Sequence, residues 1–537
     1  MKSEAESLGG NRPRSGGRGL PFALLAGFLL LLSIILTFRG ARPTWADEAF
    51  TMRIAPVYTS LFWEEINRDV HPPLYFALST LARELGPRSL KSCPYASPPS
   101  VRVFSYLVFL TLIWLTLRLA SERTARPGQI APSALLIFAS AHLALFGPML
   151  RYYGLSALGV TCATLLLLPA RQEAADSPGR TPIGRAVWYG VAMWIAIASS
   201  HLSAIVLPAH IAYIIERREP KARPFWYALL GLAIACIPLF LILRIQLHHM
   251  SVSDQPGLAG LLIGAVARGI FSLYSFTMGE FIRPWDWGFS IPSLTAFFCL
   301  MFLAWRVRKT PLGGLLWLVL SVSLPIGALV LSWIGVGVEF SPARLFFLAP
   351  MFLVLMGLGI TSEGISANAR RAGLIAVTVL VIVNLASSFN FRRGEDSIQS
   401  TYIIPWSAIS DEITLLAESF RSTAVYTDDP TMHYWLTQDD PEKLRSCDID
   451  HLMSEDLMDP GAPEQAPPEL AVFVYSPRRY SDEDIEWAAS KALHAMPQMI
   501  TETEYIEEDE TSVRWKSMLL RRPVYATKKK LVAFTGG

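Results

Sequence analysis

The sequence is poor in charged residues and in cysteine, and it has almost no net charge. Only 17% of its 537 residues are Asp, Glu, Lys or Arg, and the formal net charge is +2. A balance so close to neutral gives no basis for nucleic-acid binding, which depends on clustered positive charge. The five cysteines are scattered without a C-x-x-C pattern, so neither a zinc site nor a redox motif is indicated. We also find no internal repeat.

Long apolar runs are what the sequence has in abundance. Hydrophobic residues make up 52% of the chain, which is too apolar for an ordinary soluble protein. The runs of near-spanning length are 20–38, 101–120, 132–149, 152–169, 186–200, 202–215, 225–243, 291–305, 313–334, 344–360 and 372–390. We therefore expect a polytopic all-α membrane domain with about 11 spans.

The distribution of basic residues predicts how the chain is oriented. Residues 1–19 are polar and rich in glycine, and we expect them to be disordered and cytoplasmic. With the N-terminus inside, the later basic loops also fall inside, as the positive-inside rule requires. This holds only if residues 257–290, which include Arg268 and Glu280, do not cross the membrane. We read that segment as an outer interfacial or re-entrant piece. The long loop 39–100 then lies outside, in a multi-pass protein of the cell inner (plasma) membrane.

The pattern of apolar residues changes from residue 392 onward. Apolar blocks of strand length at 424–427 and 470–475 alternate with helical patterns at 406–420 and 482–493. This alternation predicts a small soluble α/β domain over 392–537. With the number and orientation of spans given above, this domain is extracytoplasmic. It has no glycine-rich phosphate fingerprint, which favours a substrate-gating or partner module. A disulfide between Cys93 and Cys447 is left open, because spacing cannot show pairing.

Two short segments in the outer loop carry the strongest chemical signal. Asp47 and Glu48 are adjacent carboxylates just past the first apolar run. Asp69 and His71 follow, one residue apart, and Pro72 and the proline after it then restrict the backbone. A carboxylate at a membrane boundary usually faces a cavity, a partner or the aqueous edge. The two segments together indicate a site at the membrane surface.

These residues carry a resemblance to a known group of enzymes. The Asp47–Glu48 pair, followed by Asp69-x-His71-Pro-Pro-Leu, resembles the protein O-mannosyltransferases (glycosyltransferase family 39-like). It is also similar to the wider group of polyprenyl-phosphate-sugar-dependent glycosyltransferases with the membrane fold known as GT-C, which includes bacterial aminoarabinose transferases. The resemblance implies a GT-C-like transferase domain over residues 20–391, with 39–100 as its catalytic outer loop.

The reaction implied by the resemblance requires a base and groups that bind phosphate. A sugar passes from a polyprenyl phosphate to an acceptor hydroxyl, which must lose its proton as it attacks. The resemblance gives this role of base to Asp47, whereas its structural alternative is a helix-end charge that sets topology. Glu48 would orient Asp47 or the acceptor. His71 would donate to the phosphate or the sugar, and Asp69 either joins it or caps a helix starting at Pro72.

Arginines at the outer ends of spans are the candidates for phosphate binding, since a guanidinium stays charged and binds phosphate bidentately. Arg102 opens the second span, and Arg151 with Tyr152 follows the third, as in the family. Arg344 matches a further family arginine, although Leu345 stands where bacterial members have a tyrosine. The alternative for each is snorkelling to lipid headgroups. We favour Arg151, then Arg344, then Arg102.

The sequence predicts a donor and a membrane, but it leaves several partners open. The donor is a polyprenyl-phosphate-linked sugar, and membrane lipids surround the spans. The acceptor is a protein, a lipid or a glycan, and the sugar is not specified. No cofactor and no metal ligand are assigned, and a divalent-metal requirement stays open. A rival reading is a transporter or lipid flippase, but such proteins bind near the midplane and often show paired halves. A catalytically inactive scaffold is a third reading.

Overall fold

The structure is a computed structural model of the 537-residue chain. It describes residues 48, 51, 54, 56–68, 71–85, 99–122, 127–168, 183–216, 223–249, 257–362, 364–393, 406–427, 444–448, 468–475, 481–493, 497–505 and 529–536. The segments 1–19 and 20–38, together with Asp47, Asp69 and Cys93, lie outside these described residues, as does the Cys447 side chain.

Helices make up nearly all of the described chain as far as residue 393. Five of them are long and apolar enough to cross a membrane: α5 (Pro99–Ser121), α14 (Leu258–Met278), α15 (Trp287–Arg306), α16 (Pro311–Trp333) and α19 (Ala367–Arg393). Shorter apolar helices complete the bundle: α6 (Pro127–Ala139), α8 (Tyr153–Leu167), α10 (Ile183–Ser199), α11 (Leu207–Glu216) and α18 (Ala349–Ile360). The expected class, a multi-pass helical membrane protein, is confirmed.

Two of the expected runs are broken rather than continuous. The run 132–149 is divided between α6 and α7 (Ala141–Phe146), because the Ser140 side chain accepts a hydrogen bond from Leu143 N and caps a new helix. The run 225–243 is divided between α12 (Arg223–Ala235) and α13 (Ile237–His249), which meet at a bend of 44°. Pro238 stands just after this bend, and a proline inside a helix removes a backbone donor and kinks the chain.

Short helices connect the long ones. They are α3 (Ser60–Arg68), α4 (Leu74–Leu85), η2 (His201–Val206), η4 (Val307–Lys309), η5 (Val338–Phe340), α17 (Ser341–Arg344) and η6 (Phe346–Leu348).

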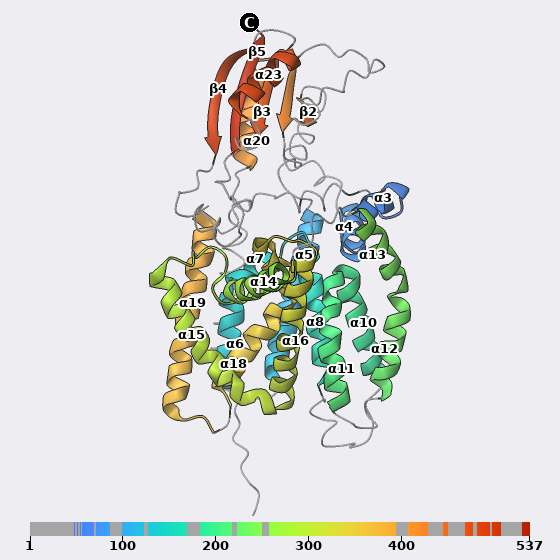
Figure 1. The fold of residues 1–537 in the computed structure, drawn as a ribbon, viewed down its shortest axis with the longest axis vertical. Coiled ribbons are helices and arrows are strands. Elements are labelled where there is room, and N and C mark those ends of the chain that lie inside the picture. The colour runs from blue at the N-terminus through green and yellow to red at the C-terminus, as the bar shows by residue number, and fades with distance from the viewer. Residues whose placement is uncertain are drawn as a thin grey trace, which may run out of the picture.

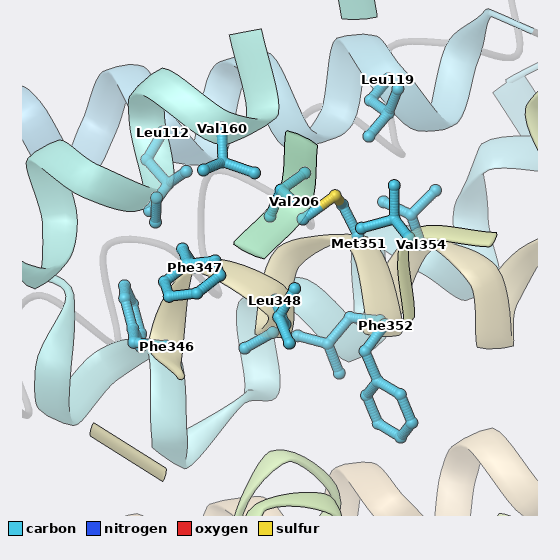
Figure 2. Packing of buried hydrophobic residues seen from close by; sticks show 14 of the residues in the cluster. Leu112, Leu119, Val160, Val206, Phe346, Phe347, Leu348, Met351, Phe352 and Val354 are labelled. Atoms are coloured by element: carbon cyan, nitrogen blue, oxygen red, sulfur yellow. The ribbon is translucent and has the colours of Figure 1, made fainter. Parts of the chain in front are cut away.

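The centre of the bundle is formed by η6 and α18. Every residue of α18 is buried, as expected for a helix that is apolar on all sides. Figure 2 shows Phe346, Phe347 and Leu348 of η6 packed together with Leu112 and Val160 from neighbouring helices. Because α17 immediately precedes η6, this packing fixes the position of Arg344 at the edge of the core.

Helix α14 lies at one end of the bundle. Arg268 donates from Nε to the carbonyl of Val336, just beyond the end of α16, at 3.1 Å. Asn384 of α19 donates to Thr277 O at 2.7 Å, so the C-terminal end of α14 is held by α19. Figure 1 shows α14 at the end of the bundle that is nearer the sheet. Helix α14 is long and apolar enough to span a membrane, and the interfacial or re-entrant placement of residues 257–290 stays a prediction.

The C-terminal region is a small α/β domain. Its strands are β1 (Thr423–Thr427), β2 (Leu444–Asp448), β3 (Leu470–Tyr475), β4 (Pro497–Tyr505) and β5 (Lys529–Gly536), in the spatial order β2-β1-β3-β5-β4. β1 pairs in parallel with β2 and β3, whereas β5 is antiparallel to β3 and β4. The predicted strands 424–427 and 470–475 are confirmed as β1 and β3.

The two faces of this sheet are each covered by a helix. Val425 and Val472 face a core that includes Ile409 of α20 (Trp406–Ala417). Phe473 faces the opposite core, with Ile485 of α23 (Asp482–Leu493). This alternation follows from the two-residue period of a strand. Figure 1 shows the sheet beyond the same end of the bundle at which α3 and α4 lie.

Candidate functional site

Six of the eight predicted site residues lie among the described residues. They are Glu48, His71, Arg102, Arg151, Tyr152 and Arg344. Asp47 and Asp69 lie outside, so their predicted roles stay predictions. The six come from five separate segments of the chain, and hydrogen bonds or ring contacts connect them into two neighbouring clusters.

The first cluster is centred on a fully buried carboxylate. Glu48 has no exposed side-chain surface, and its Oε1 accepts a hydrogen bond from Arg102 Nη1 at 2.9 Å. The same oxygen accepts from the backbone N–H of Leu150, also at 2.9 Å. Charge-assisted hydrogen bonds of this kind offset the cost of burying the carboxylate. Glu48 therefore joins the start of α5 to the loop after α7.

The loop between α7 and α8, residues 147–152, is shaped by a close helix approach. A Cβ atom added to Gly147 would lie 2.2 Å from Phe109 Cδ2 of α5, so only glycine fits there. The chain then turns through Pro148 and re-enters a helix at Tyr153. This geometry presents Leu150 to Glu48 and places Arg151 beside it.

The second cluster brings together Arg344, His71 and Tyr152. Arg344 Nη1 donates to Tyr152 Oη at 2.7 Å and also contacts His71 Nε2. The His71 and Tyr152 rings have their centroids 4.6 Å apart. A guanidinium can only donate, so His71 Nε2 is the acceptor in this contact. His71 and Tyr152 are buried, whereas Arg344 is partly exposed.

Arg151 is the most deeply buried of the three predicted arginines. Its side chain is 3% exposed, and its guanidinium carbon lies 5.6 Å from the Phe76 ring centroid and 5.8 Å from that of Tyr152. These are cation–π distances. Arg151 thus supports the aromatic side of the second cluster, whereas Arg102 and Arg344 are both partly exposed.

The arrangement is suited to holding an anion. Three guanidinium groups, two aromatic hydroxyl or imidazole groups and a buried carboxylate lie around one loop. A phosphate next to Arg344 would meet donors of the kind that bind phosphate in proteins. Within the described ranges, no three His, Cys, Asp or Glu side chains are grouped as metal ligands.

Tyr75 lies beside the first cluster and is neutral in this environment. Its hydroxyl is within 2.9 Å of Ser105 Oγ, and the side chain is buried. Burial raises the pKa of Tyr75 to about 12, and the hydrogen bond with Ser105 opposes this shift. The phenol therefore serves the packing of α4 against α5 as an uncharged group.

Sequence reasoning missed one buried amide next to the site. Gln246 of α13 donates from Nε2 to the carbonyls of Ile66 and His71, each at 2.9 Å. Its Oε1 lies 3.3 Å from His201 Nε2. A single glutamine in an apolar helix forms no motif, so only its polarity inside an apolar run could have drawn attention to it.

Comparisons with known proteins find similarity in structure but not in sequence. No family model and no curated protein matches the chain. The apo crystal structure of ArnT from Cupriavidus metallidurans matches with a TM-score of 0.50 at 14% identity, covering 95% of this chain and 98% of that one.

Two further solved structures are similar to a lesser degree. ArnT from the same organism bound to undecaprenyl phosphate matches with a TM-score of 0.47 at 12% identity, over 96% of this chain and 97% of that one. Archaeal oligosaccharyltransferase AglB from Archaeoglobus fulgidus, in complex with an inhibitory peptide and a dolichol-phosphate, matches with a TM-score of 0.47 at 10% identity, over 88% and 71%. The match to apo ArnT shows that the chain has a GT-C fold similar to that of ArnT over nearly its whole length.

Proposed function

We propose that this protein is an integral membrane glycosyltransferase that moves a sugar from a polyprenyl-phosphate donor to an acceptor hydroxyl. The observation that carries the proposal is the contact of Arg344 with His71 and Tyr152, which come from three distant segments. These residues would hold the donor phosphate. The fold supports the same class, and ArnT, which has this fold, has been solved with undecaprenyl phosphate bound.

The chemistry explains why cations are needed at this point. The acceptor oxygen attacks the anomeric carbon, and the bond from that carbon to the phosphate oxygen breaks. The bonding electrons leave with the phosphate, which gains one negative charge as it becomes a polyprenyl monophosphate. A guanidinium stabilises this added charge as it develops. Direct attack of this kind inverts the configuration at the anomeric carbon.

The proton of the acceptor hydroxyl must pass to a base. We propose Asp47 for this role and Glu48 as the residue that anchors the segment on which Asp47 stands. The support is the burial of Glu48 and its bonds to Arg102 and the Leu150 N–H, which fix that segment beside the second cluster. Asp69 would stay near the phosphate through its proximity in sequence to His71.

The proposal also concerns which side of the membrane is used. Figure 1 shows α3, α4 and the sheet toward the same end of the bundle, and His71 lies between α3 and α4 in the chain. The positive-inside pattern of the sequence puts that end outside the cell. The donor tail would lie among the spans of the inner membrane, and the acceptor would enter from the aqueous side. The acceptor class, whether protein, lipid or glycan, is left to experiment.

The test is sugar release from polyprenyl-phosphate donors by the purified full-length protein. We expect wild type to release the sugar from at least one donor of a panel, and Asp47→Asn to fold but lose release. Arg118→Gln is the matched control, because Arg118 pairs with Glu122 on the surface of α5, far along the helix from Arg102. Equal release by wild type and Asp47→Asn would remove Asp47 from the mechanism. Failure of every donor, with substrate-driven transport instead, would favour a transporter.

A further inference from the structure

The amide nitrogen of Gln246 donates one hydrogen bond to the carbonyl of Ile66 and one to the carbonyl of His71. Ile66 is in the last turn of α3, and His71 is the predicted phosphate contact. The Gln246 side chain thus connects the backbone at Ile66 to the backbone at His71. Gln246 is 1% exposed, so no solvent competes for these bonds.

The orientation of this amide is fixed by its surroundings. If the group were turned over, its oxygen would face the two carbonyl oxygens, and its nitrogen would face His201. Only the observed orientation gives donors to both carbonyls and leaves Oε1 to accept from His201 Nε2 at 3.3 Å. His201, at the start of η2, therefore completes the set of partners.

The amide also connects the site to the bent pair of helices. Gln246 stands near the end of α13, beyond the 44° bend, and α3 packs on α13. The backbone of His71 is held from this side, while its ring is held from the other side by Arg344 and Tyr152. The imidazole is thus placed by two independent sets of contacts.

We infer that Gln246, oriented by His201, is a positioning residue that holds His71 in the place where it meets the donor phosphate. This inference rests on the proposed function. A displacement of about 1 Å in a group that contacts the reacting phosphate can cost about 100-fold in rate. Gln246 itself need not touch the substrate.

The experiment measures binding of undecaprenyl phosphate to the full-length protein in lipid nanodiscs. Gln246→Met keeps the length of the side chain but removes both donors, and we expect its affinity to fall by about 10- to 100-fold, within the range of coupling between residues of one hydrogen-bond network. In a His71→Ala background the same change should weaken binding by no more than about twofold, because the residue that it positions is gone. Additive losses in the double variant would overturn the inference.

Asn384→Leu is the matched control. Asn384 is also a buried amide that bonds to three backbone groups, since it donates to Thr277 O and Leu380 O and accepts from Ala141 N, but its partners lie outside the site. We expect it to lose thermal stability as Gln246→Met does and to keep its affinity for undecaprenyl phosphate. An equal loss of affinity in both variants would reduce Gln246 to a general structural role.

A milder variant keeps the test decisive if Gln246→Met does not fold. His201→Phe removes only the group that orients the amide, and we expect an affinity loss of about threefold that disappears in the His71→Ala background. Wild-type affinity in His201→Phe would then overturn the inference. Absence of both binding and turnover in wild type would instead refute the proposed function, so the two failures are distinguishable.

Discussion

The first and second clusters both contain an arginine, but the two arginines have different partners. Arg102 meets the carboxylate of Glu48, which neutralises it inside the protein. Arg344 contacts an imidazole and a phenol. Removing one partner of a buried ion pair costs stability, because the other charge is left buried. If the proposed function holds, we therefore expect variants of the first cluster to lose mainly stability and variants of the second to lose mainly activity.

The largest effect is expected from Arg344→Gln. Loss of this cation should lower kcat/KM for sugar transfer by about 1000-fold, the scale for removing one group that stabilises developing charge. The thermal unfolding midpoint should stay close to that of wild type, because Arg344 is partly exposed. Transfer assays with Arg118→Gln as the control measure this. An activity loss in Arg344→Gln smaller than that in Arg102→Gln would reverse the comparison.

Glu48→Gln tests the first cluster. It leaves the Arg102 guanidinium without its acid, and we expect a loss of about 3 kcal/mol in unfolding free energy, near the lower end for breaking a buried pair because Arg102 keeps some exposure. Denaturation of the detergent-solubilised protein gives the value. The double variant Glu48→Gln/Arg102→Gln should recover part of the loss. If the double variant were less stable than the sum of the two single variants, the pair would not be the source of stability.

Tyr152→Phe removes one hydrogen bond from the second cluster while the ring stays. We expect kcat/KM for transfer to fall about tenfold, in line with about 1.4 kcal/mol for a hydrogen bond to a charged group. Tyr153→Phe is the neighbouring control, with the same change one residue away. Equal effects of the two substitutions would show that the Tyr152 contact with Arg344 has no special role.

Tyr75→Phe gives the smallest effect and a pH dependence. At pH 8 we expect a loss of about 1 kcal/mol in unfolding free energy, because Ser105 loses its partner. Burial raises the pKa of Tyr75 from the usual value near 10 to about 12, so the folded state binds this proton more tightly than the unfolded state. Wild type should lose stability as pH rises from about 10 to 12, and the difference from Tyr75→Phe should shrink. A constant difference across that range would show that Tyr75 does not titrate in this way.

Much of the fold follows from local patterns. The apolar runs were predictable from their length and apolar content, and the strands at 424–427 and 470–475 from short apolar blocks between helical patterns. The bend between α12 and α13 was missed because an apolar run with one proline reads as continuous. β2 and β4 were missed because their apolar residues are few or interrupted, whereas β5 was missed although Leu531–Phe534 is an apolar run.

The site was only partly visible from sequence for a different reason. His71 and Arg344 were recognised because motifs surround them, but their contact joins segments far apart in the chain. The bond from the Leu150 N–H to Glu48 involves a backbone group, which no side-chain pattern can reveal. Gln246 acts through backbone carbonyls as well. A backbone group that bonds to a remote side chain can belong to any type of residue, so the sequence does not reveal the interaction.

The position of β5 in the sheet has a consequence for biosynthesis. Strand β5 is inserted between β3 and β4, although β4 comes earlier in the chain. During translation, β4 therefore has no neighbour to bond with until residues 529–536 have been made. A premature stop before Lys529 would leave two open strand edges, which are prone to pair with other chains. Such a product should aggregate or be degraded even if its helical portion had already inserted correctly.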